Sequence, residues 1–237
     1  MKKLLFGALA LALVLTGKAY CYEQEQEIPL ELTTKYEYSF DKDNKGLSNT
    51  SCLKERITFT GFDLADPYIE ISLNKSEGES GGIKLETDTD IGIGAGIKAD
   101  VYTIKTDNWL DESVFSVQTQ VSFLKTDFDE VILNGVVQNP TTNDVEAFSW
   151  ETTVTLRKGY IFGEKLVVPY VGLRYEHTYV KTELNTGGVV INNTDREDML
   201  IPLVGVEVDW NGDTTLLAEA EYYDNEFTFL SGITLKF

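Results

Sequence analysis

Apolar and polar residues alternate along most of this chain with a period of two, which is the pattern of a β-strand with two different faces. In the final stretch, "FTFLSGITLKF", the apolar residues Phe227, Phe229, Ile233, Leu235 and Phe237 all fall on one parity. Ten segments keep such an alternation, and several have the length of about 9–11 residues that a tilted strand needs to cross a bilayer. The segments span residues 30–40, 57–59, 69–73, 83–101, 115–123, 148–156, 167–175, 200–210, 216–222 and 227–237.

The connections between these segments sort into short turns and long polar loops, which mostly alternate along the chain. One edge of short turns and one edge of long loops is typical of an outer-membrane barrel. We therefore predict an all-β, closed, antiparallel up-and-down transmembrane β-barrel of about ten strands, with eight or twelve as alternatives. An even number places both termini at the short-turn, periplasmic edge. The short turns are residues 65–67, 158–165 and 211–213, and the long loops are residues 41–54, 125–144 and 183–197.

A soluble β-sandwich also alternates, so further features must decide between the two folds. Gly92, Gly94 and Gly96 lie on the face opposite the apolar one and would leave room in a narrow lumen. Aromatic residues gather at the segment ends, as in the two aromatic girdles of a membrane barrel. The expected girdle residues are Tyr36, Tyr38, Phe40, Phe148, Trp150, Tyr175, Tyr179, Tyr222 and Phe227 at one interface, with Trp210 and Phe237 at the other.

The N-terminus has the features of a secretory signal peptide. A basic start is followed by "LLFGALALALVL", an apolar run too short to span a membrane as a helix. We expect residues 1–21 to be the signal peptide, with cleavage after Ala19 or Cys21, and residues 22–237 to form a single barrel domain. Loss of Cys21 would leave Cys52 alone, so no disulfide is expected.

Charge and motifs exclude several functions. The formal net charge is −19, which argues against nucleic acid as a partner because phosphates would be repelled. No CxxC or HExxH spacing is present, and we expect neither a metal nor a cofactor. The stretch Asp41–Gly46 begins like a calcium loop, but Cys52 stands where that loop requires a bidentate glutamate.

The C-terminal strand resembles the assembly signal of bacterial outer-membrane β-barrel proteins, with Ile233, Leu235 and the terminal aromatic Phe237 in alternation. The phrase "VPYVGLRY" is also similar to strands of small barrels of the opacity-protein and outer-membrane-protein-A type. This resemblance covers roughly residues 30–237 and implies a location in the bacterial outer membrane. It also implies insertion by the outer-membrane barrel machinery and contact with outer-membrane lipid, and it implies no reaction.

The face opposite the apolar one carries many charges, which a barrel would place in its lumen. We interpret them as an ion-pair network that fills the lumen, built around Glu151, Arg174, Glu207 and Glu219. The alternative is a narrow pore that prefers cations, because carboxylates outnumber bases. The expected lumen charges are Lys35, Glu37, Glu70, Lys84, Glu86, Asp88, Asp90, Lys98, Asp100, Glu151, Arg157, Arg174, Glu176, Glu207, Asp209, Glu219, Glu221 and Lys236.

Parity also predicts strand registers. Between segments 148–156 and 167–175, Glu151 should lie opposite Arg174 or Gly172, and we predict an Arg174–Glu151 ion pair, with Glu207 as the other candidate partner. For the last hairpin, a two-residue turn at 224–225 predicts three pairs: Tyr222 with Phe227, Ala220 with Phe229, and Ala218 with Ser231.

His177, the single histidine, has outward parity and is expected near the outer headgroups rather than in a catalytic site. We therefore expect a non-enzymatic integral outer-membrane barrel, a monomer with a structural or surface-interaction role toward an unnamed ligand. The alternatives are the cation-preferring, porin-like channel for small solutes and, third, a membrane-embedded hydrolase.

If Phe237 belongs to an assembly signal, its deletion should lower membrane insertion and raise periplasmic degradation. The measurement is the yield of folded barrel in outer-membrane fractions. Assembly of the shortened chain at normal yield would contradict this role.

Overall fold

The computed structural model describes residues 29–41, 47–80, 83–87, 89–107, 109–133, 136–138, 142–186, 189–224 and 226–237. The predicted signal peptide and most of the calcium-like stretch Asp41–Gly46 lie outside these residues. Within the described residues, no helix is long and apolar enough to cross a membrane.

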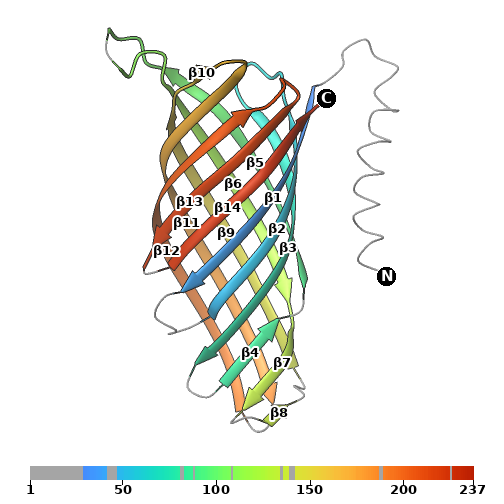
Figure 1. Ribbon diagram of the computed structural model, residues 1–237. Coiled ribbons are helices and arrows are strands. Elements are labelled where there is room, and N and C mark those ends of the chain that lie inside the picture. The colour runs from blue at the N-terminus through green and yellow to red at the C-terminus, as the bar shows by residue number, and fades with distance from the viewer. Residues whose placement is uncertain are drawn as a thin grey trace.

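The chain folds as one antiparallel β-barrel, which Figure 1 shows from the side. The barrel wall contains ten strands: β1 (Leu30–Asp41), β2 (Leu47–Phe59), β3 (Asp66–Ser80), β5 (Asp90–Thr103), β6 (Val114–Thr126), β9 (Thr142–Arg157), β11 (Lys165–Thr186), β12 (Val189–Asp209), β13 (Thr214–Tyr223) and β14 (Glu226–Lys236). Four shorter strands lie at the two ends: β4 (Ile83–Thr87), β7 (Phe128–Leu133), β8 (Val136–Gln138) and β10 (Tyr160–Phe162).

The first and last strands close the barrel. β1 pairs with β14 from Glu31–Lys236 to Asp41–Glu226, and it pairs with β2 along its other edge. The closure continues to the last residue, because the Phe237 amide donates to the Leu30 carbonyl at 2.9 Å. The predicted closed barrel of ten strands is thus confirmed, and eight or twelve strands are wrong.

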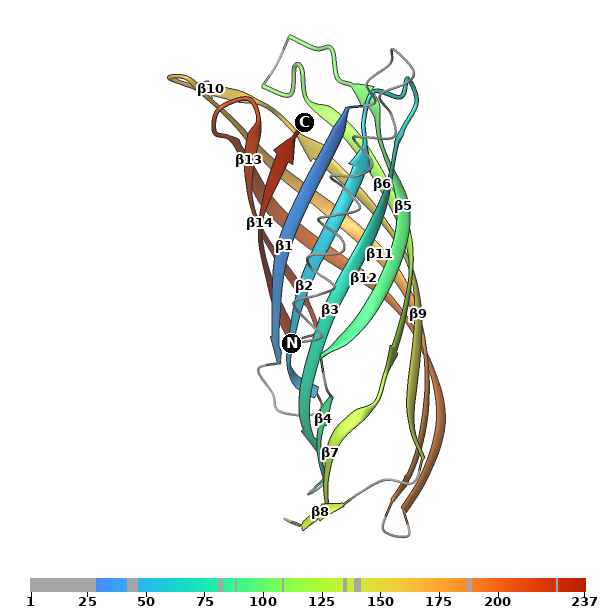
Figure 2. The ribbon, with the colours of Figure 1, turned by 90° about the vertical axis from the view of Figure 1, so that its right-hand side faces the viewer.

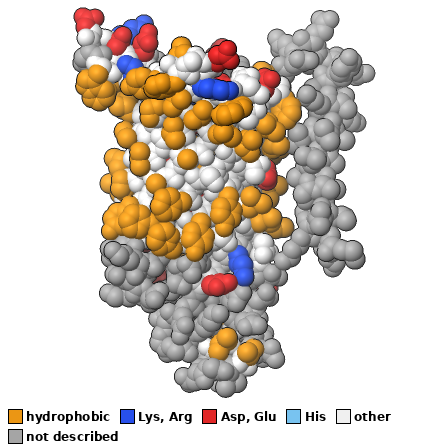
Figure 3. Space-filling view, viewed as in Figure 1, with side chains coloured by type: hydrophobic (Ala, Val, Ile, Leu, Met, Phe, Trp, Pro, Cys, Tyr) orange, Lys and Arg blue, Asp and Glu red, His pale blue; other side chains and the backbone are white. Residues whose placement is uncertain are grey.

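The two faces of each strand differ as the alternation predicts. In the last hairpin, Tyr222 pairs with Phe227, Ala220 with Phe229 and Ala218 with Ser231, so this predicted register is confirmed. Phe229 is half exposed on the outside, whereas its neighbour Leu230 is buried toward the lumen. On the face that Figure 3 displays, hydrophobic side chains gather in two bands, in agreement with the predicted girdles. Further exposed aromatic residues not expected from the sequence lie in and beside the short turns, namely Phe62, Tyr102, Trp109, Tyr160 and Phe162.

The long-loop end of the barrel is built from strands rather than loops, which corrects the sequence analysis. β11 and β12 are 22 and 21 residues long and remain paired from Leu166–Asp209 to Thr186–Val189, so residues 183–197 form a β-hairpin. Residues 125–144 likewise contain β7, β8 and the start of β9, and residues 47–54 of the first expected loop belong to β2. Figure 2 shows these strands continuing past the barrel rim. These strands were missed because a strand with two polar faces lacks the alternation of apolar and polar residues by which strands are recognised in a sequence.

The expected strand over residues 83–101 is also wrong, because it is two strands. β4 leaves the barrel and pairs with β7, whereas β5 stays in the wall between β3 and β6. The alternation runs through both β4 and β5 because each strand has one apolar and one polar face. Alternation alone does not show which strand each of them pairs with. Lys84 and Glu86 therefore lie outside the barrel wall, and Asp88 lies outside the described residues.

Candidate functional site

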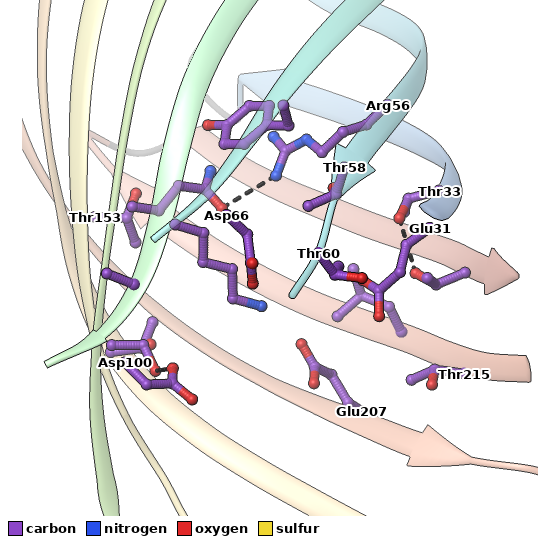
Figure 4. A pocket seen from close by; sticks show the side chains of 18 of the residues that line it. Glu31, Thr33, Arg56, Thr58, Thr60, Asp66, Asp100, Thr153, Glu207 and Thr215 are labelled. Atoms are coloured by element: carbon purple, nitrogen blue, oxygen red, sulfur yellow. Dashed lines mark hydrogen bonds between the residues drawn. The ribbon is translucent and has the colours of Figure 1, made fainter. Parts of the chain in front are cut away.

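The lumen contains the polar groups of the barrel, and it divides into an open vestibule and a filled middle. A cavity of about 540 Å³ opens at the short-turn end, where the β2–β3 turn forms part of its mouth. Figure 4 shows Arg56, Asp100 and Glu207 around this cavity, each from a different strand. The cavity reaches inward as far as Glu70, Glu151 and Arg174.

Arg56 and Glu70 form the best-buried ion pair of the described residues. They face each other directly across β2 and β3, with 2.7 Å between Arg56 Nη2 and Glu70 Oε2, and their side chains are only 10% and 4% exposed. Arg56 also donates to Gln118 Oε1 at 3.0 Å, and Gln120 Nε2 donates to Glu70 Oε1 at 3.0 Å. These bonds satisfy charged groups that have little exposure to solvent, which is the condition for burying them.

Two tyrosines pack across glycines of the neighbouring strand and so narrow the lumen. Tyr68 lies opposite Gly96, and Tyr170 lies opposite Gly205. A Cβ atom at either glycine would come within 2.5 Å of the tyrosine ring, so a larger residue would displace the ring. The Tyr68 hydroxyl donates to Gln120 at 2.9 Å, and the Arg56 guanidinium stacks on the same ring, 4.0 Å from its centroid. The glycines therefore position the rings that complete the buried network.

Arg174 is the centre of a second cluster on the opposite side of the lumen. Its guanidinium forms a short ion pair with Glu221 and lies 3.9 Å from carboxylate oxygens of both Glu151 and Glu176. The predicted Arg174–Glu151 pair is therefore present, but Glu221 is the closer partner. Beside this cluster, the Tyr170 hydroxyl donates to Glu219 at 2.8 Å.

The predicted register of these strands was wrong by two residues. Glu151 lies opposite Glu176 rather than opposite Arg174 or Gly172, and Arg174 lies opposite Thr153. The cause is β10, which pairs with the first residues of β11, so that β9 begins its pairing with β11 only at Arg157–Tyr170. Glu151 reaches Arg174 diagonally.

Further ion pairs line the lumen above and below these clusters. Lys54 Nζ lies 2.7 Å from Glu37 Oε2, at the inner end of the vestibule, which Lys54 lines. Near the mouth, Arg157 lies 2.6 Å from Asp100 and 3.9 Å from Glu207, so Glu207 pairs with Arg157 and not with Arg174.

The sequence analysis missed the lumen residues of β2. Lys54 and Arg56 were assigned to a long loop or left out, because only Ile57 and Phe59 of this strand were recognised. Their parity was the available signal, since both lie on the face opposite Ile57. His177 faces outward as expected, and its Nδ1 atom lies 2.8 Å from Asp198 Oδ1.

Comparison with known proteins shows the fold and no closer relationship. No family model matches the chain, and no curated protein matches it in sequence. The translocator domain of the autotransporter NalP from Neisseria meningitidis is similar in structure, with a TM-score of 0.54 and 10% identity over 98% of this chain and 97% of that one. The beta domain of the Bordetella autotransporter BrkA has a TM-score of 0.49 and 12% identity over 88% and 99% of the two chains. At 10% identity the likeness to the NalP domain shows the β-barrel fold and nothing finer.

The buried pair predicts a large loss of stability on mutation. Glu70→Ala leaves Arg56 as an unpaired buried charge, and we expect it to lower the free energy of unfolding by about 3–5 kcal/mol. Urea-induced unfolding in vesicles, followed by tryptophan fluorescence, measures this change.

The matched control is Glu77→Ala on the same strand. Glu77 pairs with Lys75 at 3.1 Å, and both side chains are more than 40% exposed. Its loss should cost only about 0–1 kcal/mol. Equal effects of the two substitutions would mean that the lumen is wet and the Arg56–Glu70 pair is screened.

Proposed function

We propose that this chain is a non-enzymatic integral protein of the bacterial outer membrane, with a closed lumen and a surface-interaction role. The β-sheet that extends beyond the barrel carries this role. In this proposal the short-turn end and both termini face the periplasm, the extension faces the outside, and the barrel machinery inserts the chain. The observation that carries the proposal is the length of the β11–β12 hairpin.

A tilted strand needs only about 9–11 residues to cross a bilayer. With 22 and 21 residues, β11 and β12 are about twice that length, and the excess lies beyond the aromatic residues Trp150 and Tyr175. A paired hairpin this far from the membrane is better placed to form a binding surface than to gate the lumen. It favours the surface role over a purely structural one.

One edge of this hairpin is open over a long stretch. β13 pairs with β12 only from Leu203 to Asp209, whereas β12 begins at Val189. Within the described residues, residues 189–202 thus pair with β11 along one edge alone. An open edge can take up an extended peptide by main-chain hydrogen bonds. Residues 192–198 are exposed and carry three acids and one arginine, which favours a basic, extended partner segment.

This proposal predicts how intact cells bind a basic peptide. Replacing residues 180–195 by an Asn-Gly turn joins Tyr179 to Arg196, its partner in the hairpin, and removes the outer half of the open edge. Cells with the full chain should bind a fluorescent lysine-rich peptide more strongly than cells with the shortened chain, at equal surface expression.

A charge control keeps the hairpin intact. The double substitution Asp195→Lys and Glu197→Lys reverses the charge of the edge and should also weaken binding of the lysine-rich peptide. If all three cell types bind the peptide equally, the surface role is not carried by this edge.

The second candidate is the narrow, cation-preferring channel, which the vestibule of about 540 Å³ favours. The two candidates differ in conductance. In planar bilayers we expect no stable ion current from the wild-type chain, because buried ion pairs fill the middle of the lumen. Steady single-channel openings with a reversal potential for cations would instead establish the channel.

A further inference from the structure

The outer surface of the barrel holds one charged side chain at a depth where lipid tails would surround it. Among the described residues that face outward between the two aromatic girdles, Glu55 is the one acidic or basic residue. It lies on β2 between the outward residues Leu53 and Ile57, opposite Thr34 on β1 and Ile71 on β3. Tyr36 and Phe59 mark the girdles on either side of it.

The carboxyl group is held in a fixed position by its neighbour. The Thr34 hydroxyl donates to the Glu55 carboxyl group, and its Oγ1 atom lies 3.0 Å from Oε1 and 2.9 Å from Oε2. This bond still leaves a carboxyl group in a hydrocarbon surrounding, where a polar group without further partners is costly. In its uncharged form a carboxyl group has one donor and spare acceptors, so it is complementary to a second carboxyl group.

We propose that Glu55 marks the centre of a contact between two copies of this chain within the membrane. Two copies in one membrane have the same orientation, so their twofold axis runs along the membrane normal. Residues at equal depth then meet across the axis, as an isologous interface requires. Glu55 of one copy would face Glu55 of the second, and each carboxyl group would donate to the other.

Small outward residues lie two and three strands from Glu55, across β1, and allow two barrels to approach. Ser231 on β14 and Ala218 on β13 lie opposite each other, and Ala220 lies next to them on the outward face. Figure 3 shows this side of the barrel as two hydrophobic bands, with a zone between them where backbone and uncharged polar side chains reach the surface. Small residues let the walls of membrane proteins come close together. The proposed dimer differs from the monomer expected from the sequence.

Disulfide cross-linking of the full chain in phospholipid vesicles tests the contact. In a Cys52→Ser, Cys21→Ser background, Leu53→Cys and Ile57→Cys place a thiol beside Glu55. Leu173→Cys on β11 is the matched outward control on another side of the barrel. We expect cross-linked dimers about tenfold faster with the first two variants than with the control, as a hydrogen-bonded contact in lipid would give. Equal rates at the three positions would overturn the proposal.

Substitution of the carboxyl group tests its role directly. Glu55→Leu should lower the association constant about tenfold, whereas Glu55→Gln, whose amide also donates and accepts, should retain dimers. Heat-modifiable migration of each variant in gel electrophoresis checks that the barrel is folded. Undiminished dimers in Glu55→Leu, or a wild-type chain that stays monomeric, would also overturn the proposal.

Discussion

The narrow lumen of a ten-stranded barrel imposes the constraint on which the rest of this structure depends, because a charge placed there must find a partner. Ten strands enclose little more space than eight, whose interior is filled by side chains. Arg56 with Glu70, Arg174 with Glu221, and Lys54 with Glu37 meet this requirement from five different strands. Glycines on β5 and β12 make room for Tyr68 and Tyr170 between these pairs. The wall and its contents are therefore mutually dependent, since each charge is supplied by a different part of the chain.

The same constraint separates the two ends of the molecule. A filled middle leaves the vestibule open only toward the short-turn end, and it leaves the far end free to build structure unrelated to transport. The long hairpin of β11 and β12 uses that freedom, and β4, β7 and β8 form a second extension beside it. We thus propose that the sheet beyond the barrel carries the function and that the ion pairs of the lumen stabilise the fold.

The fold could be predicted from the sequence because alternation reports which face of a strand meets lipid. The hairpin of Tyr222 and Phe227 was predicted residue by residue, since parity and a two-residue turn leave few registers. Parity also placed Arg174 and Glu151 on the same face, although the predicted register between their strands was wrong. Where a strand has two polar faces, as in residues 183–197, alternation carries no such information and the hairpin was taken for a loop.

Pairing between side chains was harder to predict than orientation. Parity placed Glu221 in the lumen, but its approach to Arg174 depends on the registers of β11 with β12 and of β12 with β13. Arg56 was missed because its strand begins within a polar stretch that carries no apolar signal. Glu55 was overlooked because it is a single charged residue on an otherwise apolar face.

The central claim is that the middle of the lumen is packed and excludes water. Cys52 provides a native probe, because its side chain faces the lumen beyond Lys54 and is only 4% exposed. Reaction of its thiol with a small, charged methanethiosulfonate reagent can be followed by mass spectrometry, in a Cys21→Ser chain folded in vesicles. A packed lumen predicts labelling only after the barrel is unfolded. Rapid labelling of the folded barrel, at a rate near that of the unfolded chain, would contradict the account.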